Sequence, residues 1–371
     1  MKSRGFVGRV TILMLLFALL TVRGHAILFK FTADPSYNTN APTGLLTNSG
    51  WQYEGQWNTG QAGLDYLGTP IAPTFFLAAH HVGGTTGMPF VFNGFTYHPI
   101  AFFDDLNSDL RIWQVAETFP SYAPLYTNSN EVGQLCVLFG RGTQRGTAVV
   151  AIPQTNGWMY GTTDFVERWG VNNVGSIKTN PSLGQFLYCT FDRSGTSNEC
   201  ALSPGDSSGG LFIQDSGTWK LAGIHYGVDG TFSFDGSGTD QFDAALMDLR
   251  GLYYQNSTGG WTFVSTGSAV TPTGSYSTRI SAHVNWINSV INYQTGPDLQ
   301  IVDSEIVGPD AVISLATGSN RLYRVDRTTN LVSGVWTTVT NNLAGTGGIV
   351  AVIDPGAADK TNQFYRAAIV Q

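Results

Sequence analysis

One short segment of the sequence combines the residue types needed for nucleophilic catalysis by a hydroxyl group. It reads Pro204-Gly-Asp-Ser-Ser-Gly-Gly-Leu-Phe212, with glycines on both sides of an adjacent serine pair. A serine hydroxyl is a weak nucleophile unless a base removes its proton and backbone N–H groups stabilise the oxyanion that forms. Glycines allow a tight turn that exposes the hydroxyl and directs N–H groups toward one cavity. A Gly-Ser surface turn without function is the alternative.

Two upstream segments carry a base and an acid. Phe75-Phe-Leu-Ala-Ala-His-His-Val-Gly-Gly84 brings two adjacent histidines to the end of an apolar stretch, and Asn107-Ser-Asp-Leu-Arg-Ile-Trp113 places Asp109 at the start of another. Taken singly, such residues more often belong to a core, a cap or a turn. Together they run His, Asp, Ser along the chain, which is one of the chain orders of a hydrolytic triad.

The three segments resemble the motifs of trypsin/chymotrypsin-like serine proteases, in their secreted bacterial branch. Ala78-Ala-His-His-Val82 resembles Thr-Ala-Ala-His-Cys, and Asp109-Leu-Arg-Ile112 resembles Asp-Ile-Ala-Leu. Gly205-Asp-Ser-Ser-Gly209 resembles Gly-Asp-Ser-Gly-Gly. The likeness covers residues 51–293, about two-thirds of the chain.

The resemblance implies a role for each residue of the triad. An alignment without gaps makes His81 the base and Ser207 the nucleophile, although His80 and Ser208 stand beside them. Asp109 would orient the imidazole and stabilise the imidazolium. No metal and no organic cofactor is implied.

Further roles follow from the same resemblance. The N–H groups of Gly205 and Ser207 would form the oxyanion hole, and Ala201 would lie at the base of the specificity pocket. A small or apolar substrate side chain is then favoured over Lys or Arg. In zymogen members of the family, a newly cut N-terminus pairs with the acid beside the nucleophile, here Asp206. Apart from signal cleavage before Ile27, nothing resembles that start, so we expect no separate activation cleavage and another partner for Asp206.

The elements that position these residues are expected to be short strands. Only 12% of residues are charged, 45 are glycine, and apolar runs bounded by turn residues recur, a pattern typical of antiparallel β structure. The expected strands of the protease region are 74–79, 90–92, 110–115, 134–139, 147–152, 184–191, 211–214 and 219–226.

One segment departs from this pattern. Val284, Ile287 and Ile291 recur at helical spacing, which predicts a helix over 281–292 with Ser281 as its N-cap. It is similar to the C-terminal helix of the protease family. We therefore expect an all-β chain with a two-barrel protease domain and one C-terminal helix at 27–294, a linker at 295–300, and a small β-sandwich-like accessory domain at 301–371.

The N-terminal 26 residues are predicted to be a signal peptide. Lys2, Arg4 and Arg9 precede an apolar run over 10–22, and the segment Gly24-His-Ala26 has small residues at its first and third positions, which predicts cleavage after Ala26. An uncleaved anchor is the alternative. We expect a secreted or periplasmic protein with no membrane span after signal removal. The net charge of −7 without a basic patch excludes a typical nucleic-acid partner.

The cysteines and one long insertion allow further expectations. Cys189 and Cys200 are close enough in sequence to form a disulfide in an oxidising compartment, which leaves Cys136 buried and free. The insertion at 228–273 is rich in Gly and Asp, which indicates a solvated loop, with a calcium-binding loop as the alternative.

These observations predict a secreted serine endopeptidase that cleaves protein or peptide substrates through an acyl-enzyme. An inactive homologue acting as a binding or adhesion module is one alternative, because both the histidine and the serine are doubled. An esterase with the same triad is another, although the strand-turn-helix elbow of many esterases is absent. The ligand of the accessory domain is not indicated.

Overall fold

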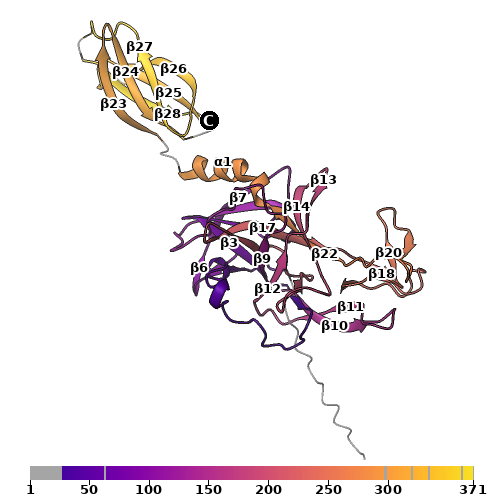
Figure 1. Cartoon of the computed structure of the whole chain (residues 1–371). Helices are drawn as coiled ribbons and strands as arrows, with labels where there is room; N and C mark the ends of the chain where they lie inside the picture. Colours follow the sequence, from indigo (N-terminus) through magenta and orange to yellow (C-terminus); the bar gives the residue numbers. More distant parts are fainter. Residues whose placement is uncertain are drawn as a thin grey trace, which may run out of the picture.

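The computed structural model describes residues 27–61, 64–295, 299–318, 321–332, 335–360 and 362–370. The described part consists mainly of antiparallel strands, and α1 (Val284–Thr295) is its only α-helix (Figure 1). The predicted all-β class is therefore confirmed. Within these residues, no helix combines the length and apolar character needed to span a membrane. The predicted signal peptide and residues 296–298 of the predicted linker lie outside the described residues.

The first barrel is a seven-stranded antiparallel sheet with an aromatic interior. Phe76 stacks on Phe90 with ring centroids 4.0 Å apart, and the rings of Trp57 and Trp113 lie 4.9 Å apart. All four side chains are fully buried. In sheet order, its strands are β6 (Phe95–Tyr97), β5 (Phe90–Phe92), β2 (Gly55–Trp57), β3 (Tyr66–Ala72), β4 (Phe75–Ala79), β8 (Leu110–Val115) and β7 (Pro99–Asp104).

The second barrel is also a seven-stranded antiparallel sheet. In sheet order, its strands are β12 (Arg168–Asn173), β9 (Leu135–Gly140), β16 (Gly210–Asp215), β17 (Thr218–Val228), β22 (Gly274–Arg279), β14 (Gly184–Thr190) and β13 (Ser176–Asn180). On β9, Cys136 and Leu138 belong to the cluster inside this barrel, whereas Val137 and Phe139 pack with the aromatic cluster of the first. Because successive side chains of a strand face opposite ways, β9 is buried on both faces and its sequence is a continuous apolar run.

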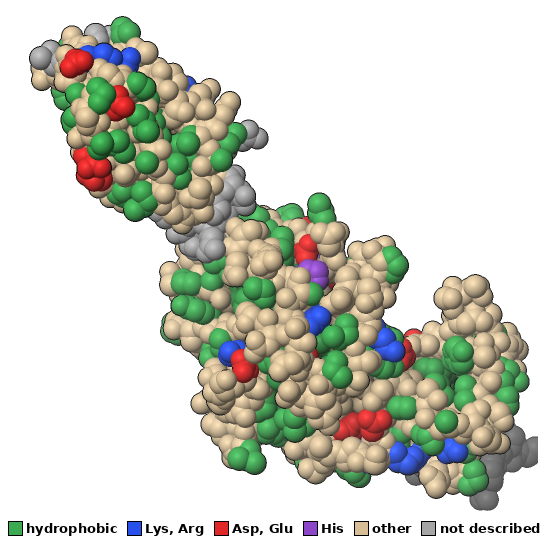
Figure 2. All heavy atoms as spheres, turned by 45° about the horizontal axis from the view of Figure 1, so that its top comes forward, with side chains coloured by type: hydrophobic (Ala, Val, Ile, Leu, Met, Phe, Trp, Pro, Cys, Tyr) green, Lys and Arg blue, Asp and Glu red, His purple; other side chains and the backbone are tan. Residues whose placement is uncertain are grey.

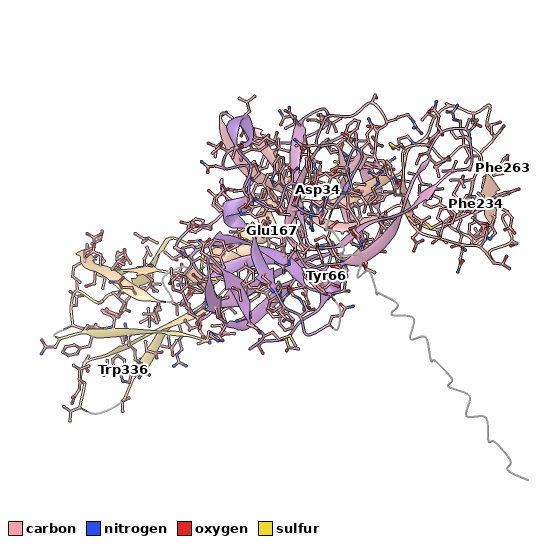
Figure 3. All side chains as sticks on the ribbon, turned by 90° about the horizontal axis from the view of Figure 1, so that it is seen from below. Asp34, Tyr66, Glu167, Phe234, Phe263 and Trp336 are labelled. Carbon is pink, nitrogen blue, oxygen red and sulfur yellow. The ribbon has the colours of Figure 1, made fainter. Side chains whose placement is uncertain are left out.

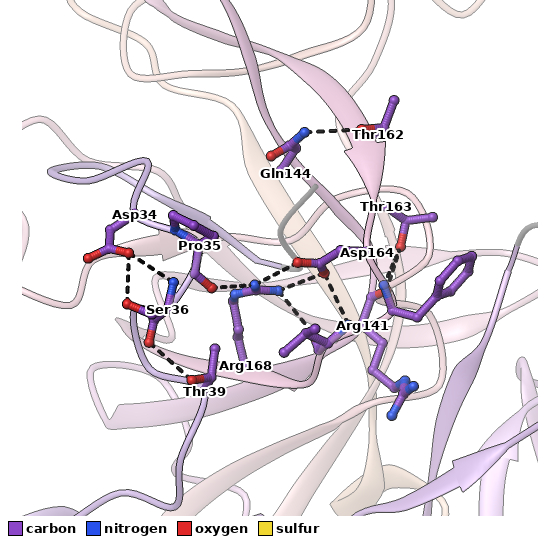
Figure 4. A network of polar contacts seen from close by, with 12 residues as sticks. Asp34, Pro35, Ser36, Thr39, Arg141, Gln144, Thr162, Thr163, Asp164 and Arg168 are labelled. Atoms are coloured by element: carbon purple, nitrogen blue, oxygen red, sulfur yellow. Dashed lines mark hydrogen bonds and ion pairs between the residues drawn. The ribbon is translucent and has the colours of Figure 1, made fainter. Parts of the chain in front are cut away.

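The N-terminal arm is more ordered than its turn-rich sequence indicates. β1 (Leu28–Phe29) pairs with β15 (Cys200–Ala201), and Ile27 is 1% exposed. Figure 4 shows a second anchor, where the buried Arg168 donates to the carbonyl of Pro35 at 2.6 Å and also binds Asp164. The arm is therefore held against the second barrel.

The helix begins later than predicted. A 3-10 turn, η4 (Ile280–Ala282), precedes α1, and Ser281 lies within that turn rather than at the helix N-cap. The Ser281 hydroxyl donates to the buried carboxylate of Glu131, which also binds the Arg279 guanidinium through both oxygens at 2.8 Å. Glu131 is distant in sequence, and its carboxylate binds the hydroxyl that the prediction assigned to the N-cap of the helix. The side chain of Ile287 packs on the core of the barrels.

The insertion after β17 forms strands, so the predicted solvated loop was wrong. A buried apolar cluster holds it together: Val149, Phe232, Ala244, Leu246 and Leu252. One of its strands, β19 (Ala244–Leu246), joins a sheet with two strands from an earlier part of the chain, β10 (Thr143–Val149) and β11 (Gly157–Thr163). The other three form a sheet of their own: β18 (Phe232–Ser233), β20 (Tyr253–Gln255) and β21 (Trp261–Phe263). We call these two sheets the side lobe, which projects from the barrels in Figure 1.

The carboxylates of the side lobe bind neighbouring protein groups. Asp235 and Asp240 both accept hydrogen bonds from the hydroxyl of Ser233. The residues that the structure describes contain no group of three or more side chains suited to a metal ion. Phe234 and Phe263 lie toward the tip of the lobe, 42% and 49% exposed (Figure 3).

After α1, the chain forms the C-terminal module (residues 299–370), a small sandwich as predicted. Its two sheets are β23 (Gln300–Val307), β24 (Asp310–Ala316) and β27 (Ile349–Asp354), and β26 (Thr337–Ala344), β25 (Leu322–Thr328) and β28 (Phe364–Ile369). Its buried core consists of its own residues alone: Ala311, Ile313, Leu315, Val325, Val352 and Ala357. Many hydrophobic side chains remain visible on its surface (Figure 2).

All three cysteines are free, buried thiols, so the expected Cys189–Cys200 disulfide is absent from the structure. Cys200 lies on β15, paired with Phe29, and its sulfur packs against the backbone of Gly170. The sulfur nearest to Cys189 is that of Cys136, 3.8 Å away. Closeness along the chain therefore did not predict closeness in the barrel.

Candidate active site

Three of the predicted site residues converge into one hydrogen-bonded chain. His81 Nδ1 lies 2.6 Å from Asp109 Oδ2, and His81 Nε2 lies 2.9 Å from Ser207 Oγ. The Asp109 side chain is only 4% exposed, whereas that of His81 is 37% exposed. The imidazole thus links an enclosed carboxylate to a hydroxyl near the surface.

Backbone contacts between two strands of the first barrel hold Asp109 beneath His81. β4 ends at η3 (His80–Val82), and the N–H of His81 donates to Asp109 Oδ1 at 2.9 Å. The N–H of His80 donates to the Asp109 carbonyl at 2.7 Å. β8 begins at Leu110, which pairs directly with the last residue of β4. The carboxylate therefore binds both the imidazole and the backbone that carries it.

The second histidine, His80, lies beside a different carboxylate, that of Asp104. His80 Nε2 lies 3.7 Å from Asp104, and its side chain is 51% exposed. Asp104 in turn forms a two-fold ion pair with Arg111, at 2.5 and 2.9 Å. Of the two adjacent histidines, only His81 contacts Ser207 in the described structure.

The two adjacent serines also differ in their surroundings. Ser207 is partly exposed, whereas Ser208 is fully buried. The hydroxyl of Ser208 accepts a hydrogen bond from the N–H of Ala79 at 3.0 Å, and its own N–H donates to the carbonyl of His225 at 2.9 Å. Ser208 therefore connects the nucleophile loop to the end of β4. The sequence contained no signal for this link between the two barrels.

His225 is a buried histidine that sequence reasoning did not single out. Its Nδ1 lies 2.9 Å from the hydroxyl of Ser277. Burial lowers the pKa of its imidazole to about 3, opposed by the nearby Phe139 carbonyl. His225 is therefore neutral at neutral pH, and it fixes the loop through its backbone carbonyl.

Gly205, a predicted contributor to the oxyanion hole, occupies a position that requires glycine. Its φ is +94°, a conformation that L side chains rarely adopt, and an added Cβ would lie 2.9 Å from Gly142 Cα. The carbonyl of Pro204 accepts from the N–H of Thr143 at 2.9 Å. The segment that carries the N–H groups of Gly205 and Ser207 is thus packed closely against the chain after β9.

Asp206 is buried and fully hydrogen-bonded. Its carboxylate accepts from the N–H of Gly142 at 2.7 Å and from the N–H and hydroxyl of Ser203, both at 2.8 Å. The backbone N–H of Ile27 is a further donor. Burial raises the pKa of Asp206 to about 6, and the hydrogen bonds from Gly142, Ser203 and Ile27 act in the opposite direction.

Ala201, the predicted base of the specificity pocket, lies among apolar side chains. It is 5% exposed and clusters with Leu28, Trp158 and Phe191. The structure does not place it within contact distance of the hydrogen-bonded chain formed by His81, Asp109 and Ser207.

A cavity of about 430 Å³ is lined in part by Tyr226, a neighbour of His81. Its walls include Phe186, Tyr226, Tyr276 and Lys178. The Tyr226 ring meets the His81 ring edge to face, with centroids 5.5 Å apart, and lies 4.8 Å from Phe186. An extended ligand could therefore reach this cavity from Ser207 by passing over one aromatic ring. Sequence analysis did not identify the cavity, because its walls come from four separate strands, β13, β14, β17 and β22.

Comparisons with known proteins give little beyond this geometry. No protein-family model and no curated protein sequence matches the chain. Among solved structures, it is similar to neuropsin, a serine protease expressed in the limbic system of mouse brain, with 15% identity and a TM-score of 0.40. The match covers 66% of this chain and 96% of neuropsin.

Proposed function

We propose that this chain is a secreted bacterial serine endopeptidase. The observation that supports this most strongly is the continuous hydrogen-bonded chain from Asp109 through His81 to Ser207. Ser207 Oγ attacks the scissile carbonyl while His81 accepts its proton and passes it to the leaving amine. Asp109 keeps the imidazole oriented and stabilises the imidazolium. Water then hydrolyses the acyl-enzyme with the same base.

The oxyanion is held by the N–H groups of Gly205 and Ser207. The left-handed conformation of Gly205 and its close packing on Gly142 support this assignment, because a preorganised donor stabilises charge without rearranging. The substrate side chain next to the scissile bond is small or apolar, since the residue that the resemblance assigns to the base of its pocket is Ala201, which carries no charge to bind Lys or Arg. Residues further along the substrate occupy the aromatic cavity beside Tyr226.

Removal of the signal peptide completes the site. Cleavage after Ala26 converts the N–H of Ile27, which already donates to Asp206, into a positively charged α-amino group. A full charge at that position offsets the cost of burying the Asp206 carboxylate. A protein that retains one extra residue before Ile27 is therefore expected to be less active and less stable than the mature one, which peptide turnover and thermal unfolding would show.

The doubled residues no longer favour the inactive alternative. His80 binds Asp104, and Ser208 binds the N–H of Ala79, so each has a contact of its own. We further propose that the C-terminal module is a separate accessory domain, as its self-contained core suggests. Its ligand is not assigned.

The proposal is tested by labelling the purified mature protein with a fluorophosphonate probe and mapping the label by mass spectrometry. We expect the label on Ser207, absent in Ser207→Ala and greatly reduced in His81→Ala. His80→Ala and Ser208→Ala are matched controls that should still be labelled. A folded protein that takes no label would instead support a binding module. Comparison of peptide and ester substrates then separates an endopeptidase from an esterase.

A further inference from the structure

Two cysteines face each other inside the second barrel, away from the site described above. Cys136 lies on β9 and Cys189 on β14, strands that are not neighbours in the sheet. Their sulfur atoms are 3.8 Å apart across 53 positions of sequence. Both side chains are at most 2% exposed. The sulfurs therefore meet across the barrel interior rather than along one ladder of the sheet.

One residue ties the backbone at both cysteines. The thiol of Cys136 donates to the carbonyl of Asn172 at 3.3 Å. The amide of Asn172 donates to the carbonyl of Thr190, the neighbour of Cys189, at 2.8 Å, and to that of Cys200 at 2.9 Å. The side chain of Asn172 thus holds β9, β12 and β14 together at the level of the sulfur pair.

We propose that Cys136 and Cys189 form a disulfide in the mature protein and that Cys200 remains a thiol. A disulfide has an S–S length of about 2.05 Å, so the sulfurs must approach by roughly 1.8 Å. Rotation of two side chains about their Cα–Cβ bonds moves sulfur atoms by that amount without moving the strands. Cys200 has no such partner, because its sulfur packs on Gly170.

The bond forms by thiol–disulfide exchange with a small or protein disulfide as oxidant. One cysteine thiolate attacks the oxidant and releases a thiolate, and the second then attacks the mixed disulfide and releases the other. Two protons and two electrons leave the pair, and the oxidant becomes a dithiol or two thiols. Burial raises the pKa of the Cys136 thiol, which suppresses the thiolate once the barrel has closed. Oxidation of the two cysteines therefore takes place during folding, before the interior of the second barrel is closed to solvent.

The crosslink would stabilise the support of the nucleophile loop. β9 leads directly into Gly142, whose N–H binds Asp206. β14 pairs with β22, where the hydroxyl of Ser275 accepts from the N–H of Leu202 at 3.0 Å. Both strands therefore hold the segment that precedes Ser207. In the cell, this inference depends on the proposed export to an oxidising compartment, whereas the test below does not.

The test uses the full mature chain, reduced in denaturant and refolded with a mixture of oxidised and reduced glutathione. Remaining thiols are alkylated under denaturing conditions, and the peptides are mapped by mass spectrometry without reduction. We expect a protein lighter by two hydrogens, a peptide pair joined at Cys136 and Cys189, and alkylation of Cys200 alone. Three alkylated thiols, or any bond that includes Cys200, would overturn the proposal.

Thermal unfolding provides a second readout that is independent of peptidase activity. Closing a loop of this length is expected to raise the unfolding midpoint by about 5–10 °C relative to the reduced protein. Cys200→Ser should keep this difference between oxidised and reduced forms, and Cys189→Ser should lose it. Equal midpoints for oxidised and reduced wild-type protein would contradict a stabilising crosslink. If a variant fails to fold, the peptide map of the wild-type chain still decides the pairing.

Discussion

The two barrels position their parts of the site by different means. The first is filled with aromatic rings, such as Phe76 stacked on Phe90, and its strands place His81 and Asp109 side by side. The second encloses hydrogen-bonded polar groups, and Asp206 and His225 support the nucleophile loop. The strands that carry the base and the acid are thus held by aromatic packing, whereas the loop that carries the nucleophile is held by a network of buried hydrogen bonds.

This difference indicates how each half should respond to mutation. Aromatic packing is spread over many contacts, so a truncation costs stability through the cavity that it leaves. A buried hydrogen-bond network fails when one partner is removed, because the other partner stays desolvated and unpaired. Substitution of Ser208 should affect both barrels, since its hydroxyl joins the nucleophile loop of the second barrel to Ala79 of the first.

The largest expected effect comes from the carboxylate that the first barrel supplies. Asp109→Asn should lower kcat on a chromogenic peptide by about 10⁴-fold, because the imidazole loses the charge that stabilises its protonated form. Thermal unfolding should change little. Asp104→Asn is the matched control, because Asp104 lies beside His80 instead. An unchanged kcat in Asp109→Asn would remove Asp109 from the mechanism.

Truncation in the aromatic interior should have the next largest effect, on stability. Trp57→Ala is expected to lower the free energy of unfolding by about 3–5 kcal/mol, measured by urea titration, since the fully buried ring contacts Phe76 and Trp113. Phe263→Ala, on the exposed side lobe, should cost less than about 1 kcal/mol. Similar losses in the two variants would show that the aromatic packing contributes little.

The link between the barrels should show an intermediate effect. Ser208→Ala leaves the buried N–H of Ala79 without its acceptor, which should cost about 1–3 kcal/mol in unfolding free energy. Ser208→Gly loses the same acceptor but relieves the positive φ of +72°, so its loss should be smaller. Urea unfolding of both variants measures the two contributions. A more stable Ser208→Ala variant would contradict the bridging role.

A pH-dependent effect concerns a pair of carboxyl groups, Glu54 and Glu167. Glu54 is 7% exposed, and one oxygen of each side chain is buried with no hydrogen-bond partner among the described residues. Burial raises the pKa of both, that of Glu167 to about 8 against the attraction of Arg141, and Glu167 further raises that of Glu54. Asp65, paired with Arg141 at 2.9 Å, is the other nearby charge.

A raised carboxyl pKa means that the folded protein holds the proton more tightly than the unfolded chain. These two groups therefore contribute most to the free energy of unfolding below pH 4.5. Their contribution falls as the pH rises toward about 8. Glu167→Gln should flatten this decline of the unfolding midpoint between pH 4.5 and about 8, whereas Glu117→Gln on the surface should not. A decline of equal slope in wild type and Glu167→Gln would exclude Glu167 as its cause.

The sequence predicted those strands and site residues that depend on a pattern of neighbouring residues. The strands around His81 and Asp109 were recognisable because they are buried on both faces and read as apolar runs. Ser207 was singled out because glycines surround it. Hydrophobic spacing located α1 to within three residues, and the error at its start came from Glu131, more than a hundred positions away.

The remaining features depend on contacts between distant segments. Nothing near Ser208 indicates that its hydroxyl binds Ala79, and nothing near Cys189 indicates that it faces Cys136. The insertion at 228–273 was read as a loop because its strands are only two or three residues long and the segments between them are rich in Gly and Asp. Such elements are stabilised by the apolar cluster that they form together, which no single segment reveals.

The edge strands of the C-terminal module bear on the solubility of the protein. Each of its sheets has only three strands, so four strands lie at an edge with one row of backbone groups unpaired in the described sheets. β23 is exposed along its whole length, and Ile306 on it is 60% exposed. An apolar edge of this kind is a template for aggregation. The carboxylates of Asp303 and Glu305 oppose it, because two copies placed edge to edge would bring like charges together.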